Sequence, residues 1–166
     1  YIQLLASDDV IIRSKIRQQV HFMTSSNLDC VYGDAFTNDQ GKLERLTYPD
    51  FANQAQRIKR VCTQDTQLPL AQSALFGRSF LDAVGFIRSE EQSDDWAMLI
   101  HAVLHSRVGY LAEPLVIYRI HEGNSYKNAW STLGMRLSVV GKVVPDEFRI
   151  HALSNVLLSH GELLLR

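Results

Sequence analysis

The order of apolar and polar positions predicts alternating strands and helices in the first half of the chain. A short apolar run, Tyr1–Ala6, predicts a strand that ends at Ser7. Leu28–Phe36 predicts another strand, and the turn signal Asn38–Gly41 lets Lys42–Tyr48 return beside it as a hairpin. Between the first two strands a helix is expected, because apolar residues recur at helical spacing, at Ile12, Ile16, Val20 and Met23.

The middle of the chain continues this alternation. Phe51–Val61 is predicted to be helical, Leu70–Phe76 to be a strand, and a short helix then ends at Gly85. The polar run Arg88–Ser93 predicts a loop. A helix begins at Asp94, because its apolar residues follow the i, i+3, i+4, i+7, i+8 pattern of one buried face, at Trp96, Leu99, Ile100, Val103 and Leu104.

The last part of the chain predicts two strands and then a pair of helices. Val108–Leu111 and Leu115–Ile120 are the strands, and the helices from Tyr126 onward are broken near Val144, with Pro145 at a first helical position. Because strands and helices alternate, the fold class is α/β. The hairpin predicts a mixed sheet flanked by helices, not a purely parallel one.

Composition narrows the class of protein. The 166 residues are the length of one domain with a substantial core. The net charge of -1, with no block of Lys and Arg, argues against a nucleic-acid partner. Cys30 and Cys62 have no metal-ligand or redox spacing and are expected to be reduced thiols in a cytosolic setting. No apolar run reaches membrane-spanning length, and no secretory leader is present.

Asp8 and Asp9 are the first candidates for chemistry, because they follow a predicted strand and precede a predicted helix. Ligands of open α/β sheets bind at the carboxyl ends of strands. Two adjacent carboxylates there can hold a hard divalent cation, which can neutralise a departing diphosphate. The alternative is that one aspartate simply caps the following helix, since Asp is a favoured N-cap.

Two further polar segments carry candidate chemistry. Ser89–Asp95 places several carboxylates before an amphipathic helix, where one can act as a general base or where all can serve as helix-terminal acids. Tyr118–Ser125 closes a strand with Arg119 and His121; arginine suits phosphate and histidine is a frequent metal ligand. The alternative for this segment is a surface turn. The other histidines lie on predicted helices without evident partners, at His21, His101, His105, His151 and His160.

Together these segments, in this order, resemble family 2 inverting glycosyltransferases of the GT-A fold. The resemblance covers roughly Tyr1–Tyr126 and implies a partial GT-A mixed sheet with a C-terminal helical pair. Residues 1–125 would be the acceptor and metal side of the transferase domain, and residues 126–166 a C-terminal helical extension. The segments that carry the resemblance are Tyr1–Asp9, Asp29–Asp34, Ser73–Arg78, Val84–Phe86, Asp94–Leu99, Tyr118–His121 and Asn124–Ser125.

The resemblance assigns roles to residues at the metal and phosphate side. Asp9 matches the direct ligand of Mn²⁺ or Mg²⁺, and Asp8 would lie near the ribose or diphosphate of the donor. His121 matches a residue near the diphosphate or the metal, and Arg119 would bind the donor. The family often has an acidic residue where this chain has Ala6, so only the final pair of the acidic motif is intact.

Other roles concern the acceptor. Asp95 matches the carboxylate that deprotonates the acceptor hydroxyl, and Asp94 is its acidic neighbour. Ser73, Ala74 and Leu75 would line the acceptor side. The resemblance therefore implies transfer of a sugar, with inversion, from a nucleotide-sugar donor to a glycan or lipid-linked acceptor.

The same resemblance sets the expected context. Bacterial relatives often build surface polysaccharides, which implies a cytoplasmic enzyme, at the inner face of the membrane where the acceptor is lipid-linked. Peripheral membrane contact and a homo-oligomer are compatible with it. The chain opens at Tyr1 inside a predicted strand, and the nucleotide-binding half of the family would lie upstream. We therefore expect a piece of a longer protein that is inactive, or nearly so, alone.

Two other functions remain open from the residues alone. A truncated or degenerate transferase can survive as a non-catalytic binding or assembly module, and the missing donor half and Ala6 favour this. Paired aspartates with a histidine also occur in metal-dependent hydrolases, although the sequence has no evident nucleophile or two-metal motif. Metal binding separates the enzymes from the module, and acceptor-independent phosphate release separates the hydrolase from the transferase.

Overall fold

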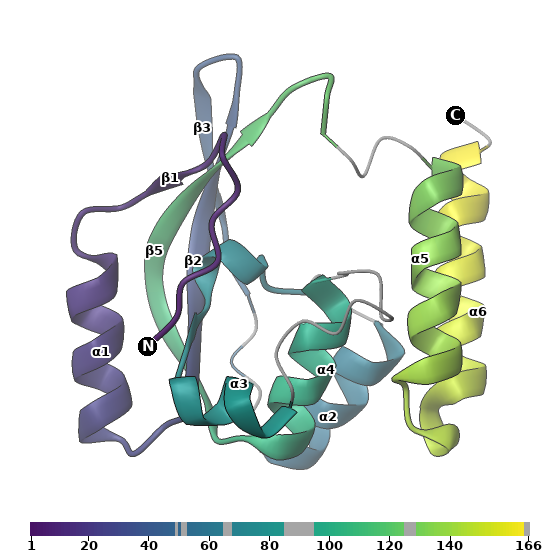
Figure 1. Cartoon of the computed structure of the whole chain (residues 1–166). Coiled ribbons are helices and arrows are strands. Elements are labelled where there is room, and N and C mark those ends of the chain that lie inside the picture. The colour runs from purple at the N-terminus through teal and green to yellow at the C-terminus, as the bar shows by residue number, and fades with distance from the viewer. Residues whose placement is uncertain (49, 51–52, 65–67, 85–94, 125–128, 165–166) are drawn as a thin grey trace. The chain divides into compact units, whose positions relative to one another are not determined.

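The structure is a computed structural model of the chain, and it describes residues 1–48, 50, 53–64, 68–84, 95–124 and 129–164 (Figure 1). The chain forms two compact units, and each is described by itself. The first comprises Tyr1–Asp50, Pro69–Phe86 and His105–His121. The second comprises Phe51–Leu68, Ile87–Leu104 and Glu122–Arg166.

Strands belong to the first unit, and most of the helical residues described belong to the second. The first unit contains β1 (Val10–Ile11), α1 (Lys15–Ser25), β2 (Cys30–Asp39), β3 (Lys42–Leu46), the 3₁₀ turn η1 (Ala71–Ser73), β4 (Leu75–Phe76), α3 (Arg78–Val84) and β5 (Val108–Ile120). The second contains α2 (Gln54–Thr63), α4 (Asp95–His105, except its last residue), α5 (Ala129–Lys142) and α6 (Asp146–Leu164).

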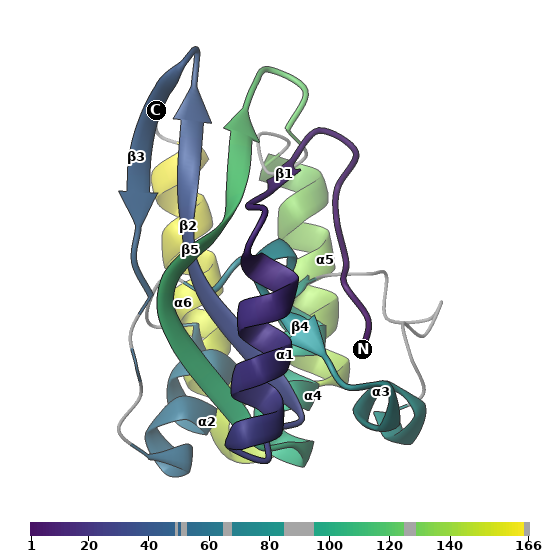
Figure 2. The same ribbon diagram turned by 90° about the vertical axis from the view of Figure 1, so that its left-hand side faces the viewer.

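One mixed sheet organises the first unit. Its strand order is β1-β5-β2-β3, and β4 also pairs with β2. The central strands β2 and β5 are parallel, whereas β1, β3 and β4 each pair antiparallel with a neighbour. Figure 2 shows β3, β2, β5 and β1 side by side, with α1 lying against them. The predicted α/β class and mixed sheet are confirmed.

The hairpin between β2 and β3 also agrees with the sequence. Asp39 pairs with Lys42 across a two-residue turn. Its central residues, Gln40 and Gly41, have φ values of 51° and 94°, which is the conformation that a tight hairpin requires. The side chain of Asn38 accepts a hydrogen bond from the Gly41 N–H at 2.8 Å and closes the turn.

The predicted strand at Tyr1–Ala6 is wrong. None of these residues is buried, and only Ile2 pairs with the sheet, through two backbone hydrogen bonds to Phe76 at 2.8 and 3.0 Å. The two-residue β1 comes later, at Val10–Ile11. An apolar run this short fits an extended edge segment as well as a strand, and pairing partners decide between them.

Two other strand predictions need correction. The predicted strands Val108–Leu111 and Leu115–Ile120 are one strand, β5, with Pro114 between them. The β2–β5 register shifts on both sides of Asp34, and Pro114 lies opposite Asp34 at this irregularity, where a strand tolerates a residue without an N–H. Within Leu70–Phe76, only the last two residues are a strand, because η1 occupies Ala71–Ser73.

Helix α1 forms where it is expected, and its buried face includes the predicted Met23 but only part of the predicted apolar positions. Ile12 lies before the helix and Ile16 is 40% exposed, whereas the buried residues are Lys15, Gln19 and Met23, spaced four apart. The two polar side chains are fully buried because backbone carbonyls in the first unit accept their hydrogen bonds. Met23 belongs to the apolar core that packs α1 on the sheet, with Val31, Leu75, Val20, Phe22, Leu28 and Leu111.

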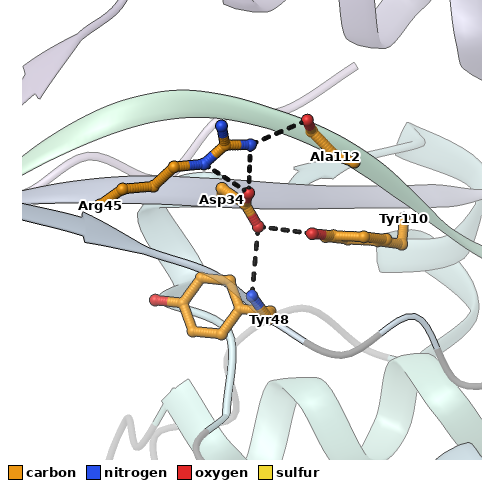
Figure 3. Close-up of polar contacts among 5 residues, drawn as sticks. All are labelled: Asp34, Arg45, Tyr48, Tyr110 and Ala112. Carbon is orange, nitrogen blue, oxygen red and sulfur yellow. Dashed lines mark hydrogen bonds and ion pairs between the residues drawn. The ribbon is translucent and has the colours of Figure 1, made fainter.

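A buried polar cluster fixes the centre of the sheet at Asp34, which has no exposed surface (Figure 3). Arg45 donates two hydrogen bonds to Asp34 Oδ2, from Nε at 3.0 Å and Nη2 at 2.7 Å. Asp34 Oδ1 accepts from the Tyr110 hydroxyl at 2.6 Å and from the Tyr48 N–H at 3.1 Å. Both carboxylate oxygens are therefore satisfied by protein groups, so we assign the cluster a structural role.

The second unit consists of helices in its described part. Helix α4 buries the predicted face, and the Trp96 indole N–H donates to the Val61 carbonyl of α2 at 2.7 Å. The predicted C-terminal pair is present as α5 and α6, although Pro145 precedes α6 instead of opening it. Asn155 on α6 donates to the Thr63 carbonyl of α2 at 2.9 Å.

Cys30 and Cys62 are both buried, and neither forms a disulfide. Burial raises the pKa of the Cys62 thiol to about 11, helped by the charge of Glu147. In the ranges that the structure describes, no helix combines the length and the hydropathy needed to cross a bilayer.

Candidate functional site

The structure places Asp8 and His121 in direct contact although 113 residues separate them in the sequence. Asp8 Oδ2 lies 2.6 Å from His121 Nε2. The contact follows from the topology, because β1 pairs antiparallel with β5, with Val10 opposite Ile117. The residues just before β1 therefore lie beside the residues that end β5. Both side chains are partly exposed, so the pair is open to a ligand from solvent.

Asp9 is held by the same strand end but is much less exposed, at 8%. Its Oδ1 accepts a hydrogen bond from the Arg119 backbone N–H at 3.1 Å. Its Oδ2 is buried and has no hydrogen-bond partner among the described residues. A buried carboxylate oxygen without a donor is unfavourable, so this atom marks a place where a ligand or cation would be stabilising.

The two carboxyl groups are in different electrostatic environments. The hydrogen bond to His121 holds the pKa of Asp8 below its usual value, and the charges of His121 and Arg119 act in the same direction. Burial raises the pKa of Asp9, and the charge of Asp8 raises it further. The Arg119 N–H and charge, and the side chain of Gln72, oppose that rise. A bound cation would stabilise both ionised carboxylates.

The local structure around the acidic pair differs from the predicted order. Asp8 and Asp9 precede the short strand β1, and do not follow a strand. They lie beside the carboxyl end of β5, which is parallel to β2, so a position at the carboxyl edge of parallel strands is retained. Neither aspartate caps α1, because its N-cap is Ser14. The capping alternative is therefore wrong for this pair.

The residues present fit a cation that takes most of its ligands from elsewhere. In the described ranges no three His, Cys, Asp or Glu side chains converge closely enough to enclose a metal ion. Asp9 Oδ2 is nevertheless an unpartnered oxygen, and the adjacent residue, Asp8, is in contact with His121. Mg²⁺ in particular is usually held by one or two carboxylates, with water and substrate phosphates completing the coordination.

Of the second acidic pair, Asp94 and Asp95, the structure describes only Asp95. Asp94 lies outside the described residues. Asp95 is exposed in the first turn of α4, where its negative charge also interacts favourably with the helix dipole. It belongs to the second unit, whereas Asp8, Asp9 and His121 belong to the first. Its proposed role as a base therefore stays a prediction.

The predicted acceptor segment, Ser73, Ala74 and Leu75, is buried in the first unit. The Ser73 hydroxyl donates to the Leu70 carbonyl at 2.8 Å. The neighbouring residue, Gln72, is the one whose side chain reaches Asp9 and influences its pKa. Sequence reasoning did not find Gln72, since a single glutamine in a short irregular segment carries no pattern. Arg119, predicted to bind the donor, has an exposed side chain at the end of β5.

Comparison with known proteins shows a similar fold. No protein-family model matches the chain, and no curated protein matches it in sequence. Among solved structures it is similar to S. aureus TarS, a glycosyltransferase, in the crystal structure of residues 1–349 in complex with UDP-GlcNAc. The TM-score is 0.55 at 12% sequence identity. The match covers 93% of this chain and 47% of the TarS chain.

The chain thus has a glycosyltransferase-like fold and spans about half the length of the structure it matches. At this level of identity the similarity concerns the fold alone. The family resemblance of the sequence is supported to that extent, and the finer GT-A assignment stays a prediction.

Proposed function

We propose that this chain is the acceptor and metal side of a GT-A glycosyltransferase, of the inverting family 2 type, which transfers a sugar from a nucleotide-sugar donor to an acceptor hydroxyl. The observation that carries the proposal is the arrangement at the β1–β5 edge. There the Asp8–His121 pair lies next to the buried, unpartnered Asp9 Oδ2, within a glycosyltransferase-like fold. TarS was crystallised with UDP-GlcNAc, which supports a nucleotide sugar as the donor class.

The residues of the β1–β5 edge suit a diphosphate and its cation. A bound Mn²⁺ or Mg²⁺ would neutralise the charge that develops on the departing diphosphate. Asp9 would hold the cation through Oδ2, while its Oδ1 stays fixed by the Arg119 N–H. His121 orients Asp8 through their 2.6 Å contact, and the Arg119 side chain adds positive charge at the strand end. Fixed groups of this kind stabilise the transition state without reorganising.

The reaction itself is a single displacement. Asp95 takes the proton from the acceptor hydroxyl, and the oxygen attacks the anomeric carbon from the face opposite the nucleotide, which inverts the configuration. Asp94 and the Ser73–Leu75 segment belong to the acceptor side. We infer a glycan or lipid-linked acceptor in the synthesis of bacterial surface polysaccharide, at the cytoplasmic face of the membrane.

Binding of Mn²⁺ and UDP to the chain tests the metal and phosphate part of this proposal. Isothermal titration should show Mn²⁺ binding that UDP strengthens. Asp9→Ala should weaken the metal-dependent binding, whereas Asp82→Ala, at an exposed surface pair with Arg78, should not. Equal affinity in Asp9→Ala and the wild type would remove Asp9 from the site. Transfer is then tested by release of UDP from a panel of UDP-sugars in a polypeptide that contains the whole transferase domain.

A non-catalytic binding or assembly role is the second candidate, and one observation favours it. Helix α6 exposes large apolar side chains, among them Ile150 at 80% and Leu158 at 66%, on the face opposite its buried Ala152 and Val156. An assembly module has no need of a cation. Failure to bind Mn²⁺ with or without UDP, together with no UDP release, would favour this role over the transferase.

A further inference from the structure

Strand β3 lies at one end of the sheet, and the edge that faces away from β2 is open. In the strand order β1-β5-β2-β3, the described part of β3 pairs with β2 alone. Figure 2 shows β3 at the left-hand edge of the sheet. The first four residues of β3 are exposed, and the apolar Leu43 is 53% exposed. An open edge of this kind can be extended by an added strand.

The hairpin decides which backbone groups point out of the open edge. Asp39 and Lys42 flank a two-residue turn, so these two residues exchange both of their backbone hydrogen bonds. Hydrogen-bonded and non-hydrogen-bonded pairs alternate along an antiparallel ladder, so Leu43 and its partner Asn38 form a non-hydrogen-bonded pair. The N–H and C=O of Leu43 are therefore directed away from β2, toward the open edge, and those of Arg45 follow two residues later.

The charges on β3 fit a second copy of the same strand. Lys42 and Glu44 lie on one face of β3 and form an exposed ion pair at 2.6 Å, whereas Leu43 between them belongs to the other face. When an identical strand lies antiparallel along the open edge, with Leu43 opposite its own copy, Lys42 lies opposite Glu44 of the second copy. The two-fold symmetry repeats this contact, so two opposite-charge pairs form.

Other registers of the two strands lack this match. Registers centred on Lys42, Glu44 or Arg45 place the charge of that residue against its own copy, which is destabilising. A register centred on Leu46 brings no opposite charges together. The register centred on Leu43 also suits the backbone, because the outward N–H and C=O of Leu43 can exchange two hydrogen bonds with those of the second copy. Its neighbours then form non-hydrogen-bonded pairs, in which side chains approach most closely.

We propose that two copies of this chain associate through their β3 edges, as an antiparallel pair of strands centred on Leu43 that joins the two sheets. The inference is independent of the proposed function, because none of the candidate site residues lies on β3. One short strand buries much less than the about 800 Å² per partner of a standard stable complex. The expected dimer is therefore weak, with a dissociation constant on the order of 0.1 mM.

Sedimentation equilibrium of the 166-residue chain, at concentrations up to about 1 mM, measures this association. Glu44→Lys places lysine against lysine across the two-fold axis, and Lys42→Glu places glutamate against glutamate. Each variant alone should associate about 10-fold more weakly or worse, because two like-charge contacts replace two opposite-charge contacts. The control is Arg78→Glu, which makes the same change of charge as Lys42→Glu at an exposed ion pair on α3 and should leave the association unchanged.

An equimolar mixture of Glu44→Lys and Lys42→Glu provides the decisive measurement. In the mixed dimer both contacts again join opposite charges, so association should return to about the wild-type level. Mixing cannot repair a hairpin that has lost its fold, so recovery separates lost pairing from lost structure. A wild-type chain that stays monomeric up to about 1 mM would overturn the proposal. A mixture that associates no better than either variant alone would also overturn it.

The exposed apolar face of α6 is the competing surface for self-association. Ile150→Glu places a charge on that face at a residue that is 80% exposed. For a dimer formed through β3, Ile150→Glu should associate as the wild type does. Association that is lost in Ile150→Glu but unchanged in Glu44→Lys and Lys42→Glu would assign the dimer to α6 and overturn the β3 pairing.

Discussion

Lys15 on α1 donates a hydrogen bond to the carbonyl of Ala74, 3.2 Å away, from a side chain with no exposed surface. Its other acceptor is the Gln3 carboxamide oxygen. Both of these acceptors are neutral, and burial lowers the pKa of Lys15 to about 7. A neutral amine has two N–H donors, which matches these two acceptors. The buried amine is thus suited to lose its proton near neutral pH.

This predicts how Lys15→Met changes the dependence of stability on pH. In the unfolded chain the pKa of lysine is about 10.4, so between pH 7 and 10 the unfolded state binds a proton that the folded state has released. The free energy of unfolding therefore rises with pH in this window. Below pH 7 Lys15 is protonated in both states. The folded state then carries the full cost of burying the charged amine, on the order of 5 kcal/mol.

Urea unfolding of the wild type and Lys15→Met from pH 6.5 to 9.5 measures the effect. The difference between the two proteins cancels the contributions of other groups. The wild type should gain several kcal/mol relative to Lys15→Met as pH rises. A difference that stays constant over the whole range would show that Lys15 does not titrate there.

The Asp34 cluster predicts a large loss of stability from a single substitution. Asp34→Ala leaves the Tyr110 hydroxyl and the Tyr48 N–H without their acceptor and removes the partner of Arg45. Arg45 is about half exposed and stays solvated, so most of the loss comes from the N–H and the hydroxyl left without an acceptor, about 1–3 kcal/mol for each group. The matched control is Asp82→Ala at the exposed Arg78 pair, for which about 0.5 kcal/mol or less is expected. Equal midpoints of urea unfolding for the two variants would contradict the structural role of Asp34.

The elements that were predictable from the sequence are those that local residues specify. The β2–β3 hairpin depends on Asn38 and Gly41, which set the turn without help from the rest of the chain. Helix α4 buries the apolar face that its own spacing indicates. In both cases the information lies within a few residues, and tertiary contacts agree with it.

The face of α1 and the site were not predictable in this way. Lys15 and Gln19 are buried because carbonyls 54 to 59 residues away accept their hydrogen bonds, and no local pattern encodes such a partner. The 113-residue separation of Asp8 and His121 is closed only by the pairing of β1 with β5. The family resemblance named both residues, but it did not reveal their contact or the neighbouring Gln72.

A side chain in place of Gly33 should clash with β5 at the irregular β2–β5 pairing. A Cβ at this position would lie 2.7 Å from the Leu111 carbonyl oxygen and 2.4 Å from Leu115 Cδ1. Because one of these atoms is backbone, the strands must shift, and Gly33→Ala should destabilise the protein by about 1–3 kcal/mol.

Gly134 is the matched control for Gly33, since it lies within α5 and a Cβ there meets nothing within 4 Å. Gly134→Ala should stabilise by about 0.5–1 kcal/mol, because alanine loses less backbone entropy than glycine in a helix. Thermal unfolding of both variants measures the contrast. Destabilisation of the same size in both would show that crowding against β5 is not the cause.

Asp95 carries the chemical step of the proposed function, and Asp95→Asn separates that step from donor binding. The asparagine amide has nearly the shape of the carboxyl group but cannot take the proton from the acceptor hydroxyl. A general base contributes about 10²- to 10⁴-fold to a rate, so kcat should fall by that factor in a polypeptide with transferase activity. Affinity for UDP and Mn²⁺ should stay near that of the wild type.

Asp95 is exposed in the first turn of α4, where a lost carboxylate also weakens the helix terminus. Asp146→Asn, an exposed aspartate in the first turn of α6, reproduces that effect without the chemistry. Transfer by Asp95→Asn at the rate of Asp146→Asn would exclude Asp95 as the base.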